Sequence, residues 1–335
     1  MGKYIIKRLI MMIPVMLGVL TIAFILNELT PGDAATALAG SEATEEQVQA
    51  IREDLGLDQP VLVRYGRYVW GLFTRADMGT SYTTNQPVLD EILARYPTTL
   101  KLAFLSVAVA VLIGIPLGVV AAVKQYTWLD NLTMTISLLG VSMPPFWLGL
   151  MLIFVFSVTL GVLPGSGLGA GWQSWVLPVI TIGFSSAATI ARVTRSSMLE
   201  VIRQDYIRTA KAKGQHPFVI VVGHGLRNAM IPIITVIGTQ IGVQLGGAVL
   251  AETVFALNGL GSYMVSAIKG RNYPVVQGGV VFLSLIFSFV NLAVDLIYTF
   301  IDPSLKTMFQ SKGRRAARKE LKRQLAAAEG VQENG

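Results

Sequence analysis

The sequence predicts an all-α, polytopic membrane protein with about six membrane-spanning helices. Of its 335 residues, 53% are hydrophobic and only 14% are charged, and the mean hydropathy of +0.58 is typical of membrane proteins. The charged residues are clustered, which leaves several apolar stretches of about 20 residues, the length that crosses a bilayer. The chain has no series of ten-residue alternating segments, which a membrane β-barrel would require.

Six apolar segments are the predicted spans. They cover residues 9–29, 102–123, 132–160, 175–191, 229–250 and 278–301. The first follows Lys3, Lys7 and Arg8 and also fits a signal peptide. Its apolar run is longer than the about 7–15 residues of a signal peptide, and the Ala-x-Ala sequence at 37–39 lies well downstream. We therefore expect an uncleaved first span.

The distribution of Lys and Arg predicts that both termini are cytoplasmic. Bases outnumber acids by seven to two in residues 192–227 and by eight to four after residue 301. The 161–174 loop has no charge, and the 31–97 loop has five bases and ten acids. With six spans, the N-terminus, the 192–227 loop and the C-terminus lie on one side. Lys269 and Arg271 in the last outer loop are a mild exception.

The same features predict four parts. Residues 1–29 form the N-terminus and first span, and 30–97 form an extracytoplasmic region. Thr44-Glu45-Glu46-Gln47 is a capping box that predicts a helix to about Leu55. Residues 98–305 form a core of five spans that includes the cytoplasmic loop 192–228. Residues 306–335 form a basic tail, either solvated or held to anionic membrane lipid; we do not expect nucleic acid binding.

Two spans carry helix-breaking residues. Pro144 and Pro145 interrupt the third span, where non-helical backbone must be buried or line a cavity. Gly114, Pro116 and Gly118 predict a bend in the second span. Interrupted helices of this kind favour a transporter over a simple anchor.

The fifth span has a small-residue face and a polar face. Gly238, Gly242 and Gly246 are spaced to let another helix approach closely. Gln240 and Gln244 lie on another side, where their amides either make interhelical hydrogen bonds or line a water-filled path.

Few ionisable residues fall within the spans. Asp295 in the sixth span is expected to make a structural pair near the inner end, because a proton-coupled carrier would place carboxylates near the midplane. His216 and His224 lack neighbouring metal ligands, and the chain has no cysteine and no phosphate-binding G-x-x-x-x-G-K-[ST] sequence. We therefore expect no metal, no cofactor and no catalytic residue.

The most informative segment is the basic loop from Asp205 to Gly214. Small and cationic residues alternate in it, and a glycine followed by Pro217 ends it, so it predicts a short surface helix. This helix is too short to span the bilayer and has no wide apolar stripe. It is therefore expected to face a soluble partner in the cytoplasm, and any ATP that powers the protein is expected to be hydrolysed on another chain.

These segments together resemble those of a known family. The cytoplasmic motif of that family, Glu-Ala-Ala followed three residues later by Gly, reads Arg208-Thr209-Ala210 ahead of Gly214 here, and Pro232 lies farther on than in the general motif. The other matching segments are Pro31-Gly32-Asp33, Leu55-Gly56-Leu57-Asp58-Gln59-Pro60, Arg192-Val193-Thr194-Arg195-Ser196-Ser197-Met198, His224-Gly225-Leu226-Arg227-Asn228-Ala229-Met230-Ile231-Pro232, Gly259-Leu260-Gly261, Tyr273-Pro274-Val275-Val276-Gln277-Gly278 and Asn291-Leu292-Ala293-Val294-Asp295-Leu296. From the first span to Leu305, the chain resembles a permease subunit of the dipeptide, oligopeptide and nickel class of ABC importers.

The resemblance implies a type I ABC importer permease fold in the cell membrane of a bacterium or archaeon. It also implies four kinds of partner: a second permease, two ATP-binding subunits, an extracytoplasmic substrate-binding protein and a peptide substrate that passes between the permeases. The ATPase-coupling residues would be Asp205, Tyr206, Arg208, Ala210, Lys211, Ala212 and Gly214, with Ala210 and Ala212 entering a groove of the ATPase. The alternatives are glutathione or a nickel chelate as cargo, or, in another class, an ion-coupled secondary transporter.

Overall fold

The computed structural model describes residues 2–29, 32–40 and 42–301. The chain falls into two compact units, 1–291 and 292–335, and each is considered by itself. The described part of the second unit is the end of α12 (Tyr273–Ile301). Within the described part, the regular structure is helical except for one isolated bridge between Thr80 and Pro87. The all-α prediction is confirmed.

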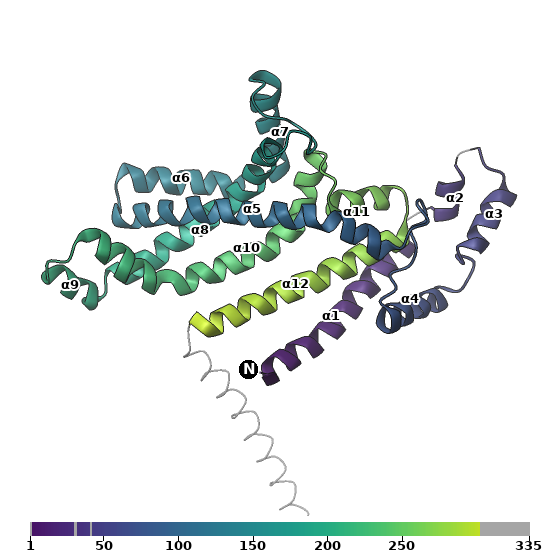
Figure 1. The fold of residues 1–335 in the computed structure, drawn as a ribbon, viewed down its shortest axis with the longest axis horizontal. Coiled ribbons are helices and arrows are strands. Elements are labelled where there is room, and N and C mark those ends of the chain that lie inside the picture. The colour runs from purple at the N-terminus through teal and green to yellow at the C-terminus, as the bar shows by residue number, and fades with distance from the viewer. Residues whose placement is uncertain (1, 30–31, 41, 302–335) are drawn as a thin grey trace, which may run out of the picture. The chain divides into compact units, whose positions relative to one another are not determined.

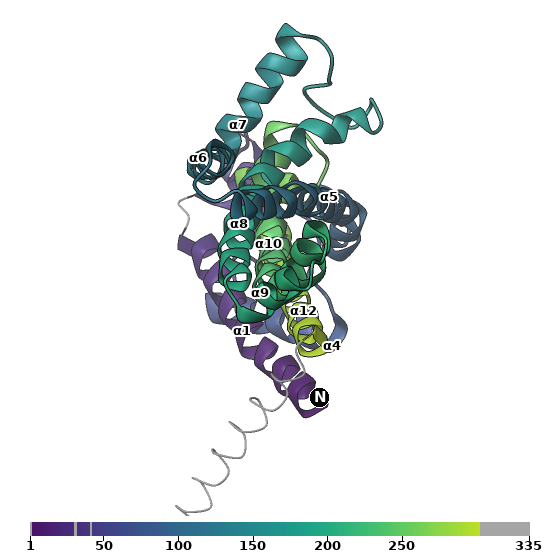
Figure 2. The same cartoon turned by 90° about the vertical axis from the view of Figure 1, so that its left-hand side faces the viewer.

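Three long helices form the centre of the first unit. They are α5 (Val88–Val123), α8 (Gln173–Ile202) and α10 (Arg227–Val254), which pack side by side (Figures 1 and 2). α6 (Trp128–Ser142) packs against α5 and α8, and α11 (Leu260–Lys269) packs against α5 and α10. α9 (Asp205–Ala212) lies at one end of the three long helices, and α11 lies at the other (Figure 1).

Two glycines of α5 allow its backbone to touch that of α8. A Cβ atom on Gly114 would lie 2.7 Å from the carbonyl oxygen of Ala187, and one on Gly118 would lie 2.5 Å from that of Ala191. α5 is a single helix through Pro116. Gly114 and Gly118, for which the sequence predicts a bend, therefore serve close helix packing, in which any side chain would collide with backbone atoms.

The apolar helices match the predicted spans in number. Among the described residues, five helices are long and apolar enough to cross a membrane, and a bent pair of helices makes a sixth when it is counted as one span. The five are Arg8–Leu29, Val88–Val123, Gln173–Ile202, Val219–Gly246 and Tyr273–Val294. Three of the predicted boundaries differ by ten residues or more: the second span begins at Val88, the fourth continues to Ile202 and the fifth begins at Val219.

The bent pair is the predicted third span. α6 ends at Ser142, Met143 is extended, and α7 (Pro145–Leu152) begins behind Pro144. α7 continues directly into a π-helix, η1 (Ile153–Thr159), and the two halves of the span meet at 104°. The predicted interruption at Pro144 and Pro145 is confirmed, because neither proline can donate the backbone hydrogen bonds that would continue α6.

The segment between the first two spans is folded. After α1 (Gly2–Leu29) come α2 (Ala34–Ala39), α3 (Glu45–Asp54) and α4 (Val61–Arg75). The predicted capping box is present at the start of α3: the Gln47 backbone N–H donates to Thr44 Oγ1 over 3.4 Å, and the Thr44 N–H donates to Gln47 Oε1 over 3.0 Å. The predicted helix over this segment is therefore confirmed.

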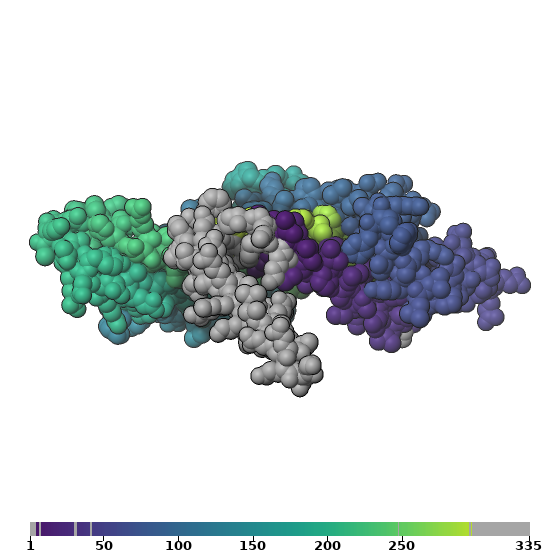
Figure 3. All heavy atoms as spheres, turned by 90° about the horizontal axis from the view of Figure 1, so that it is seen from below, coloured from purple at the N-terminus to yellow at the C-terminus, as the bar shows by residue number. Residues whose placement is uncertain are grey.

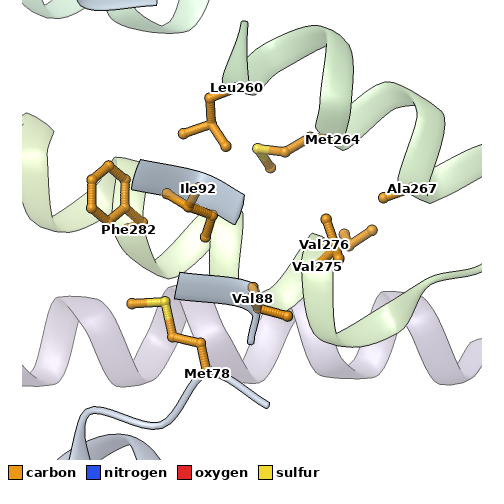
Figure 4. Packing of buried hydrophobic residues seen from close by; sticks show 9 residues of the cluster. All are labelled: Met78, Val88, Ile92, Leu260, Met264, Ala267, Val275, Val276 and Phe282. Atoms are coloured by element: carbon orange, nitrogen blue, oxygen red, sulfur yellow. The ribbon is translucent and has the colours of Figure 1, made fainter. Parts of the chain in front are cut away.

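An apolar cluster fixes this region to α11 and α12. It joins the loop after α4, the first turns of α5 and the facing sides of α11 and α12 (Figure 4). Its members are Met78, Val88, Ile92, Leu260, Met264, Ala267, Val275, Val276 and Phe282. Gly278 lets α12 approach α5, because a Cβ there would lie 2.7 Å from Val88 Cγ1. The cluster gives this end of the unit a packed apolar core.

Candidate coupling site and substrate path

The predicted surface helix is present as α9. It begins behind the extended Gln204 and covers Asp205–Ala212. Tyr206, Arg208, Lys211 and Ala212 are exposed, and Asp205 Oδ1 lies 3.6 Å from Arg208 Nη1. Such an exposed ion pair contributes at most about 1 kcal/mol to stability. The charged side of α9 is thus open to a partner.

The inner side of α9 is anchored in its own chain. Ile207 and Ala210 are 1% and 7% exposed, and both pack against Ile220 in η2 (Val219–Leu226), a π-helix that leads into α10. The expectation that Ala210 enters a groove of the ATPase was wrong, because its methyl group is buried in this cluster. Ala212 is the alanine that remains exposed.

Gly214 ends α9 as predicted. It follows the cap residue Lys213 and has a φ of +71°, in the left-handed region that residues with a Cβ avoid. No heavy atom lies within 4 Å of the position that its Cβ would occupy. Glycine is therefore required here by the backbone conformation and not by crowding.

An ion pair fixes the end of α8 that leads to α9. Arg195 on α8 donates from Nε to Asp130 Oδ1 over 2.6 Å and from Nη2 to Asp130 Oδ2 over 2.8 Å. The Tyr126 backbone N–H also donates to Asp130 Oδ2. The Asp130 side chain is 3% exposed and that of Arg195 is 23% exposed. A buried two-point pair of this kind fixes both position and orientation.

The prolines of the broken span lie beside a contact between three helices. Pro144 is exposed and Pro145 is half-buried. Farther along α7, Gly149 is buried, and a Cβ there would lie 3.3 Å from Phe255, Thr181 and Val254 atoms. The structure therefore leaves the prolines at an accessible break, while α7 itself is packed against α8 and α10.

The two glutamines of α10 make interhelical hydrogen bonds. Gln244 is 5% exposed, and its Nε2 donates to the Ile182 carbonyl oxygen over 2.7 Å and to Ser186 Oγ over 2.9 Å. Ser186 Oγ also donates to Gln240 Oε1 over 3.3 Å. The sequence left two alternatives for these amides, interhelical hydrogen bonds or a water-filled path. The structure shows hydrogen bonds to α8.

The glycine face of α10 is only partly a packing seam. Gly238 is buried, and a Cβ on Gly242 would lie 2.7 Å from the Phe287 ring of α12. Gly246 is exposed and has no heavy atom within 4 Å of its Cβ position. Within the described chain, close packing reaches Gly242 and leaves Gly246 open, so the approach of another helix at Gly246 stays a prediction.

A buried carboxylate holds the other end of the long helices together. Glu252 on α10 is 0% exposed; it accepts hydrogen bonds from Thr99 Oγ1 at 2.5 Å and from the Ser262 backbone N–H at 2.8 Å. The second bond places the carboxylate at the N-terminus of α11, which favours negative charge. Burial nevertheless raises the Glu252 pKa above its ordinary value. A Cβ on Gly259 would lie 2.2 Å from the Glu252 carboxyl carbon, so this glycine makes room for the carboxylate.

A second polar cluster ties α5 to α11. The Tyr263 hydroxyl donates to Glu91 Oε2, and the Arg95 guanidinium lies 3.9 Å from the centre of the Tyr263 ring. Burial, and then the bond to Glu91, raise the pKa of Tyr263 to about 12. Asn272 is also buried and donates to Ser81 Oγ over 2.9 Å. These contacts hold the folded loop against the long helices.

Asp130, Glu91 and Asn272 were not predicted from the sequence. The usable signal among them is Asp130, a lone aspartate at the start of an apolar helix. The side chain of Asp295 and the basic tail 306–335 lie outside the described residues. Among the residues that are described, no three potential metal ligands come together.

The chain matches two models of one known family. Residues 114–307 match the model of the binding-protein-dependent transport system inner membrane component, and residues 1–103 match the model of its N-terminal region. The chain belongs to this family. Membership of the family makes it a transport permease component of a membrane, in agreement with its apolar helices.

Curated relatives are similar over almost their whole length. The chain is 41% identical over 333 residues to the dipeptide transport system permease protein DppB of Alkalihalophilus pseudofirmus, covering 91% of this chain and 100% of the relative. It is 43% identical over 306 residues to the glutathione transport system permease protein GsiC of Salmonella paratyphi A, covering 91% and 99%. A putative peptide transport system permease of Brucella abortus is 43% identical, with the same coverage.

A solved structure shares the fold. The inward-facing MetNI methionine ABC transporter contains a chain that superimposes with a TM-score of 0.55 at 22% identity, covering 64% of this chain and 97% of the other. The expected ABC importer permease fold is thus confirmed.

Proposed function

We propose that this protein is one permease subunit of an ATP-driven importer of short peptides. The observation that carries the proposal is α9, a short charged helix that packs against η2 and leaves its other side open. The chain is also at least 41% identical to the dipeptide, peptide and glutathione permeases compared above. The subunit provides half of the path, and a second permease provides the other half.

Energy enters through α9. Two ATP-binding subunits dock on its exposed side, where Asp205, Arg208, Lys211 and Ala212 are accessible. Because Ile207 and Ala210 fix α9 to η2, a displacement of α9 reaches both α8 and α10. Closure of the ATPase dimer then shifts the equilibrium between two membrane conformations.

Orientation follows from this assignment. The basic 192–228 loop that contains α9 lies in the cytoplasm with both termini, in keeping with the distribution of Lys and Arg. The folded 30–97 region and α11 then lie outside the cell membrane, where an extracytoplasmic binding protein delivers the substrate. The 98–305 core forms the path, and ATP hydrolysis belongs to the partner subunits.

Glutathione is the second candidate cargo. The observation that favours it is the 43% identity to the glutathione permease GsiC. Glutathione is itself a small peptide, so both cargoes need the same kind of path. The binding protein that accompanies the complex decides between them.

The test is uptake by the complete transporter in proteoliposomes. The chain is purified with its partner permease, ATPase subunits and binding protein, and radiolabelled dipeptide, tetrapeptide and glutathione are compared. We expect ATP-dependent accumulation of at least one of them, and no ATP hydrolysis or accumulation by this chain alone. Accumulation by the isolated chain under a proton or sodium gradient would instead establish an ion-coupled carrier.

A further inference from the structure

Helix α4 (Val61–Arg75) exposes an apolar face. Leu62, Trp70 and Phe73 are 83%, 70% and 47% exposed. Their spacing places them on one side of the helix, with Gly66 between them. The rest of the described chain leaves this side uncovered. Exposed large apolar side chains grouped on one helix face indicate an interaction surface.

The opposite side of α4 faces the protein. Arg64, Arg67, Tyr68 and Gly71 line a cavity of about 360 Å³ together with residues of α1, the turn after α3, the 77–85 loop and the start of α12. α4 therefore turns polar groups toward its own chain and apolar groups away from it. This is the reverse of a helix that borders water, so the apolar side requires a non-aqueous environment.

Contacts with α1 set the level of α4 in the membrane. The Tyr65 hydroxyl lies 2.7 Å from Thr21 Oγ1, and the Tyr65 ring packs edge-on against Phe24 at 5.3 Å between centroids. Arg64 pairs with Glu28 at 2.5 Å. From Thr21 to the end of the span at Leu29 is roughly 12 Å at 1.5 Å per residue. α4 thus lies beside the terminal turns of a membrane span, at the depth where acyl chains meet headgroups.

The basic charge of α4 favours anionic lipid as the environment of its apolar face. The helix has three of the five bases in residues 31–97 and none of the ten acids. A helix with arginines on one side and Trp, Leu and Phe on the other is typical of binding in the plane of an anionic membrane surface. Ile22, Ile25 and Leu26 of the neighbouring span α1 are exposed apolar side chains as well.

We propose that α4 is an interfacial helix that lies in the headgroup region on the side where α1 ends. Leu62, Trp70 and Phe73 enter the acyl region, and Arg75, which is exposed at the end of the helix, contacts lipid phosphate. The helix thereby fixes the position of the 30–97 region, and of the cavity beside α4, relative to the membrane surface. This assignment is independent of the cargo.

The absence of cysteine from the chain allows a direct test. Leu62→Cys, Trp70→Cys and Phe73→Cys are spin-labelled one at a time in the complete transporter, in nanodiscs of phosphatidylethanolamine and phosphatidylglycerol. Collision rates with oxygen, which partitions into lipid, and with a water-soluble nickel chelate are then measured. The controls are Leu26→Cys on α1 and Glu46→Cys on α3, both exposed positions.

We expect the three α4 labels to behave like the Leu26 label, with an oxygen-to-nickel collision ratio several-fold above that of the Glu46 label. In unlabelled protein, lipid brominated near the headgroup should quench Trp70, so that Trp70→Phe shows less quenching than the native chain. Labels that collide freely with nickel would place α4 in water. Labels shielded from both reagents would place it against another protein. Either result overturns the proposal.

Discussion

Arg195 and Asp130 form a two-point ion pair, at 2.6 and 2.8 Å, that joins the start of α6 to α8 three turns before α9. α8 continues as a helix to Ile202, beyond the predicted span 175–191, and this extension carries Arg192 and Arg195. The aspartate neutralises one of these arginines inside the bundle.

Removing one member of this pair should destabilise the transporter. Arg195→Gln leaves the buried Asp130 carboxylate uncompensated, which costs on the order of 3 kcal/mol. Asp130→Asn should cost less, because Arg195 can still reach solvent. The double variant should be more stable than the sum of the two losses predicts, measured as thermal unfolding of the purified complex. Additive losses would mean that the pair contributes nothing beyond its separate residues.

Gly214 should be essential for coupling. Gly214→Val forces a β-branched residue into positive φ at a cost of at least about 1–2 kcal/mol. It should weaken recovery of the ATPase subunits in a pull-down and reduce peptide uptake, with the chain still inserted in the membrane. Gly214→Asn is the matched control, since asparagine tolerates this conformation. Normal association and uptake by the valine variant would remove the end of α9 from the mechanism.

Gly118 should tolerate no side chain. Its missing Cβ would lie 2.5 Å from the Ala191 carbonyl oxygen, a backbone atom that moves only with α8 itself. Gly118→Ala should therefore lower stability by about 1–3 kcal/mol. Gly246→Ala is the control, because its Cβ would meet no neighbour within 4 Å. The measurement is the unfolding temperature of the complex that carries each variant. Equal unfolding temperatures for Gly118→Ala and Gly246→Ala would refute the backbone contact.

Glu252 should make stability depend on pH. Burial raises its pKa in the folded state, so the folded protein holds this proton more tightly than the unfolded chain. Between the unfolded value of about 4.3 and the raised folded value, stability should then fall as pH rises. This titration concerns a group outside the membrane span, because the apolar stretch of α10 ends at Gly246. Glu252→Gln should flatten this part of the pH profile of thermal unfolding, and an unchanged slope would assign it to other groups.

The sequence was sufficient for the features that depend on local composition. Apolar length located the spans, Pro144 and Pro145 located the break, and the Thr44 capping box located α3. The left-handed Gly214 was also predictable, because a glycine followed by a proline commonly ends a helix. These signals act within a few residues of one another.

Features that depend on distant contacts were not predictable. Arg195 remains inside the bundle only because Asp130, 65 positions away, reaches it. Ala210 is buried because Ile220 folds back onto α9. Gly242 packs against Phe287, whereas Gly246 has no neighbour at its Cβ position. This difference was not predictable from composition, because it depends on where α12 crosses α10.

The backbone contact at Gly114 and Gly118 has a mechanical consequence. Two helices that touch through backbone atoms cannot slide or roll against each other without breaking that contact, so α5 and α8 act as one stiff rod. The 36 residues of α5 make this rod roughly 54 Å long. One end leads to α9 and the other bears Glu91 and its bond to Tyr263. A small tilt imposed at α9 therefore becomes a larger sweep at the far end, as with a lever.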